Sequence, residues 1–379
     1  MFWFLLILFT VQLCFAYAYR YRPGAAETYL PAEWPGVSIV ICGKNEAQNI
    51  QRFLPLVLAQ QYLHNDWELL FVNDASSDES AALLKALQQQ YPQLNVITIA
   101  PAEQRLFPGK KHALLQGLKQ SRYDLVLLSD ADCFPASEFW LEGMVKAYQQ
   151  LKDKNGLAAN FVLGYGAYQK AAGLLNRFVR WETRHTFMQY ASWARLYRPY
   201  MGVGRNLLYH KQSVIALLEQ DSGFIATFAE TASGDDDLII SKLATIANTI
   251  IADHPATHTI SVAPAAWQQW WRQKTRHVSS GKYYAPLVKY GLALYALSAF
   301  AFWLLALIVL VSSAGLIQKL VLFLILCRLA AFWANAFKWS SAAGHTKQAW
   351  FYPLGEWMWL LYNLAVSPFI FWKNKQQWK

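Results

Sequence analysis

The distribution of apolar residues constrains the fold of this 379-residue chain more than any other feature. Residues 283–372 are almost wholly apolar and aromatic, and a second apolar run covers residues 1–19, whereas residues 34–282 resemble an ordinary globular domain. Charged residues make up 15% of the chain, against about 25% in an average soluble domain. This pattern excludes a disordered chain and a coiled coil. It predicts a membrane protein with a large soluble part.

The first apolar run is long enough for one transmembrane helix of about 20 residues. Arg20 and Arg22 follow it, and basic residues at one end of a span favour the cytoplasm for that end. A signal peptide would instead carry its positive charge before the apolar run. We therefore expect residues 1–22 to form an N-terminal anchor and residues 34–282 to form a cytoplasmic domain of an integral cell-membrane protein.

The C-terminal part, residues 283–379, is expected to contain two to three transmembrane helices and a basic tail. The candidate spans are residues 287–312, 316–337 and 350–372. Lys338 and Lys347 flank the connection between the last two, which favours a cytoplasmic loop there. The third candidate contains two prolines and Glu356, so it either spans the membrane or lies partly at its surface.

A net charge of +10 and a pI near 9.3 favour an anionic partner, which could be nucleic acid, anionic lipid or a phosphorylated substrate. The membrane anchors argue against nucleic acid. The four cysteines show no CxxC spacing, so neither a zinc site nor a disulfide framework is indicated. A reducing compartment fits this usage best.

The first half of the soluble part alternates short apolar runs with helical patterns. The expected strands are residues 37–42, 67–72, 95–99 and 125–129, and the expected helices are residues 45–58, 80–90 and 112–120. Continuously apolar strands that alternate with helices are typical of a parallel sheet covered on both faces. In such α/β sheets, ligands bind beyond the carboxyl ends of the strands.

Polar clusters follow three of these strands. They occupy residues 43–46, 73–78 and 130–132, and a further cluster at residues 109–112 opens a helix. A single aspartate after a strand is usually a helix cap or a turn residue. Because the carboxyl ends of parallel strands lie side by side, however, the three clusters together predict one shared site.

Two of these clusters carry groups suited to a diphosphate. Asp130 and Asp132 are paired carboxylates at a strand end, which suit a hard divalent cation that also takes phosphate oxygens. Lys110 and Lys111 at a helix start add positive charge for the same phosphates. Asp74 is placed like acids that bind a ribose or a base edge. Solvated lysines and capping aspartates remain the plain alternatives.

Two later segments add candidate groups. Asp235, Asp236 and Asp237 open a helical run, and three successive acids exceed what capping needs. One of them could serve as a general base. Residues 273–277 precede the apolar block, and by composition alone they could form a basic helix beside the membrane.

Together these segments resemble a family 2 glycosyltransferase with the GT-A fold, of the membrane-anchored kind that includes ceramide glucosyltransferase and cellulose synthase. The resemblance runs from about residue 37 to residue 281 and rests on the order and spacing of residues 44–46, 72–78, 109–113 and the DxD motif at 130–132. It implies an α/β fold with a mainly parallel sheet, together with N-terminal and C-terminal transmembrane helices.

The resemblance also implies roles for individual residues. Asp132 would be the main ligand of a divalent cation, Mg or Mn, and Asp130 would face the nucleotide and the same metal. The nucleotide-sugar donor, expected to be a UDP-sugar, would be bound by Asn45, Glu46, Asp74, Lys110, Lys111 and Asp130. The intact set of Asp130, Asp132, Asp236 and Arg276 argues against a catalytically silent protein.

Two motifs depart from the family pattern. The usual Glu-Asp base motif is replaced by aspartates, so the register selects either Asp236 or Asp235 as the base; we expect Asp236 and leave Asp235 open. In the QxxRW motif, Gln273 and Arg276 match, but His277 stands where tryptophan is usual. Arg276 is expected to face the diphosphate, and His277 to contact substrate.

The acceptor side has its own signal. Residues 170–211 contain eight basic residues, one acid and several aromatics, which suits either the surface of an anionic membrane or a helix packed on the domain. Gly204 and Asn206 lie in a segment that resembles the family's acceptor loop. We therefore expect an inverting transfer to a hydroxyl of a lipid or lipid-linked acceptor. The alternatives are a processive polysaccharide synthase and a non-catalytic membrane protein that binds nucleotide sugars.

Overall fold

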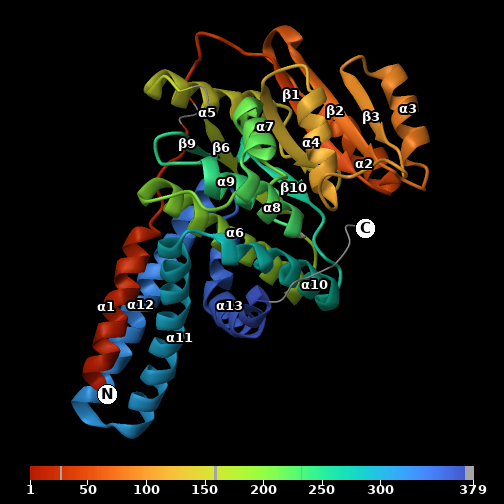
Figure 1. Ribbon diagram of the computed structural model, residues 1–379. Helices are drawn as coiled ribbons and strands as arrows, with labels where there is room; N and C mark the ends of the chain where they lie inside the picture. The colour runs from red at the N-terminus through yellow and green to blue at the C-terminus, as the bar shows by residue number, and fades with distance from the viewer. Residues whose placement is uncertain (26–27, 158–159, 232, 372–379) are drawn as a thin grey trace.

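The structure is a computed structural model that describes residues 1–25, 28–157, 160–231 and 233–371. It contains an α/β domain above a bundle of apolar helices (Figure 1). The strands are β1 (Val37–Gly43), β2 (Trp67–Asp74), β3 (Leu94–Ile99), β4 (Leu125–Asp130), β5 (Cys133–Pro135), β6 (Phe161–Gly164), β7 (Gly166–Tyr168), β8 (Leu207–His210), β9 (Thr249–Ala252) and β10 (Thr259–Ser261). The helices of the domain are α2 (Ala47–Leu58), α3 (Ser80–Gln90), α4 (Lys110–Gln120), α5 (Trp140–Asn155), α6 (Leu174–Leu196), α7 (Lys211–Gln220), α8 (Ser222–Glu230), α9 (Asp237–Leu243) and α10 (Trp267–Val278).

The apolar segments form α1 (Phe2–Ala18), α11 (Pro286–Ser312), α12 (Gly315–Ala342) and α13 (Tyr352–Val366), and short 3-10 turns connect several elements. One of these turns, η4 (Thr346–Phe351), joins α12 to α13. The strands and helices expected over residues 37–130 are all confirmed, with boundaries that differ by one or two residues at most ends. The basic tail expected after residue 372 lies outside the described residues.

The main sheet has seven strands in the order β3-β2-β1-β4-β8-β6-β9. Strands β1 to β4 are parallel, and β8 runs antiparallel to both β4 and β6. A smaller sheet pairs β5, β10 and β7. In the main sheet, Cys42 lies opposite Asp130 and Gly43 lies opposite Asn73. This register brings the carboxyl ends of β1, β2 and β4 to one edge, as the sequence predicts.

Both faces of the main sheet are covered because its strands are apolar on both sides. Val37, Ile39 and Ile41 belong to a core shared with α2 and α5, whereas Val40 and Cys42 belong to a core on the opposite face. This alternation follows from the two-residue period of a strand. The second core continues through α6 into α1, α11, α12 and α13, so the domain and the apolar helices pack as one unit.

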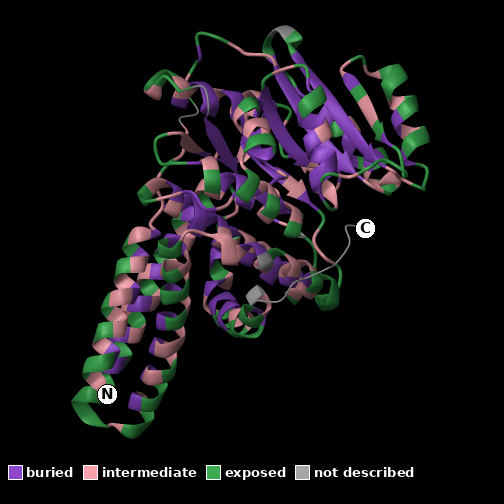
Figure 2. Ribbon diagram, viewed as in Figure 1, coloured by how far each residue is buried: buried purple, intermediate pink, exposed green. Residues whose placement is uncertain are grey.

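Many residues on the outer surface of the helix bundle are exposed (Figure 2), and a large share of them carry apolar side chains. Among the described residues, α11 and α12 are long and apolar enough to cross a bilayer, while α1 is apolar but has 17 residues. Exposed large apolar side chains on these helices include Trp3, Phe4, Leu307, Val311 and Phe323. The third C-terminal candidate forms the 15-residue α13, which the 3-10 turns η4 and η5 (Ser367–Phe371) adjoin on either side. The α-helix itself is shorter than the roughly 20 residues that a span needs.

The expectation that residues 170–211 form a membrane-resting surface is wrong for most of that stretch. Its central part is α6, which is largely buried between the sheet and the helices α12 and α13. Aromatic residues such as Trp181 and Phe187 contact both sides. Lys211 lies elsewhere, where its buried ammonium donates to the Ser121 carbonyl. The alternative of a packed helix is therefore confirmed.

A buried ion pair joins four apolar helices. The Arg328 guanidinium of α12 donates to both Glu356 oxygens of α13, at 2.7 and 3.0 Å, and to the Gln12 side-chain oxygen of α1, at 2.7 and 3.2 Å. Gln12 in turn donates to the Ser298 hydroxyl of α11, at 2.8 Å. Tyr352 donates to Glu356 at 3.0 Å. Arg328 and Glu356 are almost completely buried, so each charge depends on these partners.

We predict that Glu356→Gln lowers the free energy of unfolding by about 3–5 kcal/mol, because it leaves the Arg328 charge buried without its counterion. Thermal unfolding of the purified full-length protein in detergent micelles measures this loss.

The matched control is the double variant Arg328→Met/Glu356→Met, which removes both charges and keeps similar volumes. It should recover most of the lost stability, because an uncharged pair leaves no unpaired ion. Equal destabilisation by the single and the double variant would contradict this account.

Candidate functional site

A cavity of about 840 Å³ opens at the carboxyl edge of the main sheet. Its walls come from the ends of β1 and β4, the start of α4, the face of α6, residues 201–205, residues 233–237, α10 and α13. The cavity thus extends from the sheet edge to the apolar C-terminal part of the chain. Many of the residues predicted for the site line it: Glu46, Lys110, Lys111, Asp130, Asp132, Gly204, Asp235, Asp236, Gln273, Arg276 and His277.

Three of the predicted site residues, Asn45, Asp74 and Asn206, do not line the cavity. Each instead makes hydrogen bonds to other parts of the protein. Asn45 clamps two loops, because its backbone N–H donates to Ser76 and its side-chain oxygen accepts from the Ser77 N–H at 2.8 Å. Asp74 is fully buried and accepts from both terminal nitrogens of Arg105.

Asn206 is also completely buried, and its side chain makes three hydrogen bonds. Its amide nitrogen donates to the carbonyls of Tyr165 and Thr257, at 2.9 and 2.8 Å, and its oxygen accepts from the Trp140 indole at 2.9 Å. These bonds hold the backbone just after Gly204, and so they fix the wall of the cavity.

The carboxylates at the end of β4 could hold a metal. The side-chain ligand atoms of Asp130, Asp132 and Cys133 all lie within 4.8 Å of one another. Burial and the neighbouring acids raise the pKa of the Cys133 thiol well above its ordinary value, so it stays protonated. Two carboxylates with room for further oxygen ligands suit Mg²⁺ or Mn²⁺, and the residues therefore fit the expected divalent cation.

Lys110 neutralises part of this acidic edge. Its ammonium pairs with Asp130 and lies 3.8 Å from an Asp235 oxygen. Burial pushes the pKa of Asp130 upward, but the Lys110 charge outweighs it and the net shift is downward. Burial and the adjacent Asp130 charge raise the pKa of Asp132. Positive charge brought close to Asp132 would favour its ionised form.

The three successive acids have different surroundings. Gly234 takes a φ of +84°, which turns the chain into α9, and a Cβ there would lie 2.9 Å from Ser280. Asp236 accepts the backbone N–H of Gly204 at 2.6 Å and that of Asp237 at 2.9 Å. The Asp237 carboxylate accepts from the hydroxyls of Ser280 and Tyr284, both at 2.8 Å. Asp236 is therefore held by backbone groups at the cavity wall.

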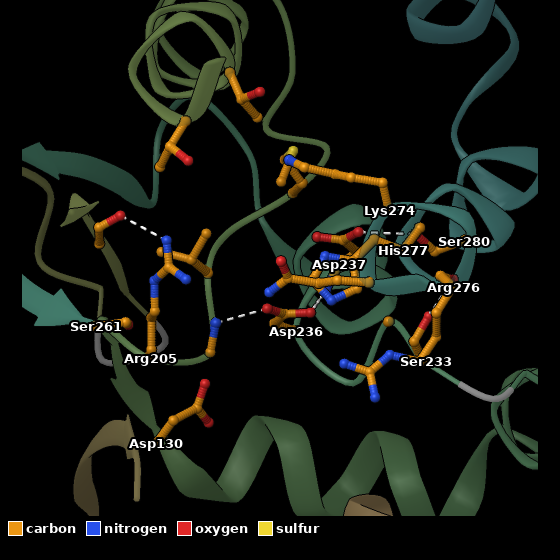
Figure 3. Close-up of a pocket in the computed structure, with 18 of the residues that line it drawn as sticks. Asp130, Arg205, Ser233, Asp236, Asp237, Ser261, Lys274, Arg276, His277 and Ser280 are labelled. Carbon is orange, nitrogen blue, oxygen red and sulfur yellow. Dashed lines mark hydrogen bonds between the residues drawn. The ribbon is translucent and has the colours of Figure 1, made fainter. Parts of the chain in front are cut away.

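Burial, and then the neighbouring Asp235 charge, raise the pKa of Asp236 to about 6. A carboxylate with that pKa is ionised at neutral pH, yet it is basic enough to accept a proton. Figure 3 shows Asp236 between two groups of side chains, with Asp130 and Arg205 on one side and Arg276 and His277 on the other.

Helix α10 supplies the opposite wall. Gln273 donates to the Tyr168 hydroxyl at 3.1 Å. Ser233 donates to the Arg276 carbonyl at 2.9 Å, which ties the acidic loop to α10. Lys274 pairs with Glu182 of α6. The predicted Gln273, Arg276 and His277 therefore face the same cavity as the acids.

The side chain of Lys111 is held by backbone carbonyl groups. Its ammonium is buried and donates to the carbonyls of Phe228 and Thr231, at 2.8 and 2.6 Å. Burial lowers the pKa of Lys111 to about 8. The residue therefore anchors the end of α8 just before the acidic loop, besides lining the cavity.

Sequence reasoning missed several cavity residues. Arg205 donates to the Gly166 carbonyl at 2.6 Å and lies over the Tyr168 ring; the sequence places it in the acceptor-like loop beside Gly204, but it was not predicted as a site residue. Glu182 of α6 and Lys274 of α10 form an ion pair although they lie 92 positions apart in the sequence. The α13 residues that line the cavity are Trp359, Tyr362 and Asn363. No local motif marks Glu182 or the α13 residues, and Arg205 and Lys274 stand inside segments whose other residues carried the prediction.

Residues 38–206 match the family profile described as "Glycosyl transferase family 2". The chain is 26% identical over 258 residues to "Probable glycosyltransferase YdaM" of Bacillus subtilis (strain 168), and the alignment covers 66% of this chain and 56% of that protein. It is 35% identical over 100 residues to the poly-beta-1,6-N-acetyl-D-glucosamine synthase of Staphylococcus aureus (strain COL), covering 26% of this chain and 22% of the synthase. The chain thus spans only part of the length of either relative.

Among solved structures, the fold resembles the mannosyltransferase PcManGT from Pyrobaculum calidifontis in complex with GDP-Man and Mn²⁺. The TM-score is 0.55 at 18% identity, and the match covers 97% of each chain. This likeness extends over the α/β domain and the apolar helices. It shows that the two chains share a fold.

We predict that Asp132→Ala weakens Mn²⁺ binding by the purified protein more than about tenfold, because it removes one of the two carboxylates at the end of β4. The free Mn²⁺ signal in electron paramagnetic resonance measures this binding without any substrate. The control variant Asp66→Ala removes an exposed acid and should bind Mn²⁺ like the wild type. Unchanged binding by Asp132→Ala would exclude the metal role of this pair.

Proposed function

Because the chain belongs to glycosyltransferase family 2 and has the GT-A fold, we propose that it transfers a sugar from a nucleotide-diphosphate sugar to a hydroxyl of a lipid or lipid-linked acceptor. One observation carries this proposal. A single cavity is lined by the Asp130 and Asp132 carboxylates, by the backbone-held Asp236 and by the α13 residues Trp359 and Tyr362. Groups suited to a diphosphate, to a hydroxyl and to an apolar molecule therefore share one space.

The proposed reaction is a single displacement with inversion. The acceptor oxygen forms a bond to the anomeric carbon of the sugar while the bond from that carbon to the diphosphate oxygen breaks. Asp236 takes the proton of the attacking hydroxyl, and the diphosphate leaves with the bonding electron pair. This scheme requires no covalent intermediate with the enzyme.

The leaving diphosphate gains negative charge, and cavity residues can stabilise it. Lys110 and Arg276 line the cavity and offer ammonium and guanidinium donors to phosphate oxygens. A divalent cation held by Asp130 and Asp132 would supply Lewis-acid stabilisation of the same charge. Lys110, which pairs with Asp130 at this edge, would offer its ammonium to a phosphate oxygen of the bound donor.

The shape of α13 supports a lipid acceptor. One side of this helix lines the cavity through Trp359 and Tyr362, whereas Leu354, Leu361 and Leu364 on its other side are exposed. A short helix with an exposed apolar side suits the membrane surface. A lipid could then keep its chains in the bilayer while its headgroup hydroxyl reaches Asp236.

We propose that α1, α11 and α12 anchor the protein in the cell membrane with the domain in the cytoplasm. Their exposed apolar side chains need an apolar environment, and Arg20 and Arg22 lie at the domain end of α1. An integral protein of this orientation meets cytoplasmic nucleotide sugars and membrane lipids at the same surface.

The decisive experiment incubates the purified protein with a panel of UDP- and GDP-sugars, Mn²⁺ and extracted membrane lipids. Released nucleoside diphosphate identifies the donor, and mass spectrometry identifies the glycosylated acceptor. We expect one donor to give a lipid that carries a single added sugar. A long polymer would favour the processive alternative, and no release with any donor would favour a non-catalytic protein.

We predict that Asp236→Asn lowers turnover at least about a hundredfold, the scale expected for the loss of a general base, while donor binding is largely retained. Single-turnover transfer and donor binding are measured on the same preparation. Asp235→Asn serves as the matched variant. A large loss in Asp235→Asn alone would move the base by one residue.

The same assignment predicts the acid limb of the pH profile. Asp236 acts only when it is deprotonated, and its pKa is raised to about 6. The value of kcat/KM should therefore fall about tenfold for each pH unit below about 6. Residual activity in Asp236→Asn should lack this limb. A wild-type rate that stays constant down to about pH 4.5 would contradict the assignment.

A further inference from the structure

A buried arginine at the side of the domain that faces the helix bundle has no hydrogen-bond acceptor among the described residues. Arg184 of α6 is 5% exposed. None of its three guanidinium nitrogens has a hydrogen-bond acceptor within the described part of the chain, and no carboxylate described there forms an ion pair with it. Its guanidinium instead lies 5.6 Å from the centre of the Tyr165 ring. A guanidinium stays charged in proteins, and a buried charge without partners is costly.

The surroundings of Arg184 are positive rather than acidic. Arg180 lies one turn earlier on α6, is half-buried, and has a buried Nε without an acceptor among the described residues. Burial, together with the charges of Arg184 and Arg180, lowers the pKa of nearby His345 to about 4. The acid closest to Arg184 in sequence, Glu182, is paired with Lys274 at the cavity described above.

The arginines of α6 form a track into the protein. Arg177, Arg180 and Arg184 are spaced by three and four residues, so they share one side of the helix. Along this side they pass from exposed to half-buried to buried. Like charges at this spacing repel one another, so the two inner arginines, Arg180 and Arg184, favour an anion that lies between them, whereas the charge of the exposed Arg177 is solvated.

A small cavity adjoins the buried end of this track. It has a volume of about 20 Å³ and is lined by Arg184, by Trp339 and Ser340 near the end of α12, and by Tyr352 at the start of α13. That volume admits one oxygen-sized atom. The elements that line it, α6, the end of α12 and the start of α13, lie where the bundle meets the domain (Figure 1). This is the level of lipid headgroups if α11 and α12 cross the membrane.

We propose that a phosphate group binds on Arg184 and Arg180, with one oxygen in the cavity between α6 and α12. The phosphate belongs to the headgroup of an anionic membrane lipid or to free phosphate. Guanidinium groups pair well with phosphate because their donors match its oxygens in geometry and charge. The site is separate from the reaction cavity, so its existence does not depend on sugar transfer. A bound lipid phosphate would fasten α6 to the bundle.

The test measures thermal unfolding of the full-length protein in detergent with added phosphatidylglycerol, with added phosphatidylcholine, or with inorganic phosphate against chloride of equal ionic strength. We expect phosphatidylglycerol to raise the wild-type Tm by at least about 2 °C over phosphatidylcholine. Arg184→Gln should lose this difference, and Arg177→Gln, which removes an exposed arginine of the same helix, should keep most of it.

The arms separate the two phosphate sources. A shift with phosphatidylglycerol alone assigns the site to a lipid headgroup, and an equal shift with millimolar inorganic phosphate assigns it to free phosphate. No shift in either arm, or an equal shift in Arg184→Gln, would overturn the proposal and leave Arg184 solvated by water only.

A second measurement covers the case in which Arg184→Gln does not fold. Native mass spectrometry of the wild-type protein, released from mixed micelles that contain both lipids, counts the lipids that stay bound. Preferential retention of one phosphatidylglycerol supports a lipid site, and retention of one inorganic phosphate supports a free-anion site. Retention of neither ligand would overturn the proposal without any variant.

Discussion

The pair of Arg328 and Glu356 constrains the whole lower half of this protein. Two full charges inside apolar helices are tolerated only when every donor and acceptor has a partner, and here Gln12 and Tyr352 complete the set. Satisfying that set requires α1, α12 and α13 to meet at one point, with α11 joined through Gln12. Because α13 is fixed in this way, its other residues form the floor of the reaction cavity.

The domain could be predicted from sequence because its signals are local. Continuous apolar strands predicted β1 to β4, and the parallel register then placed Asp130 beside Cys42 at the sheet edge. The acids at residues 235–237 and the Gln273 segment were found because they stand next to a helix start or to the apolar block. Their meeting in one cavity follows from topology that local patterns only suggest.

The remaining features could not be predicted, since they depend on contacts between distant segments. The stretch around α6 has the composition of a membrane surface, yet it is buried because the bundle and the sheet both need an apolar partner and α6 provides one to each. The pair of Glu182 and Lys274 and the cavity role of Trp359 arise from the same packing. Asn206 is the opposite case. It lies in a loop that resembles a binding motif, but its side chain is wholly engaged in hydrogen bonds that hold the backbone.

The burial of α6 also links the two halves electrostatically. Its side toward the reaction cavity carries Glu182, which is balanced by Lys274, whereas its side toward the bundle carries Arg184, which no described residue balances. One helix therefore presents a neutralised charge to the reaction cavity and, on the side that faces the helix bundle, a positive charge that no described residue compensates. Burying both is costly unless each has a counter-charge. Lys274 supplies the counter-charge of Glu182. The charge of Arg184 must instead be balanced by a bound anion or solvated by water, so the position of α6 is sensitive to what surrounds the bundle.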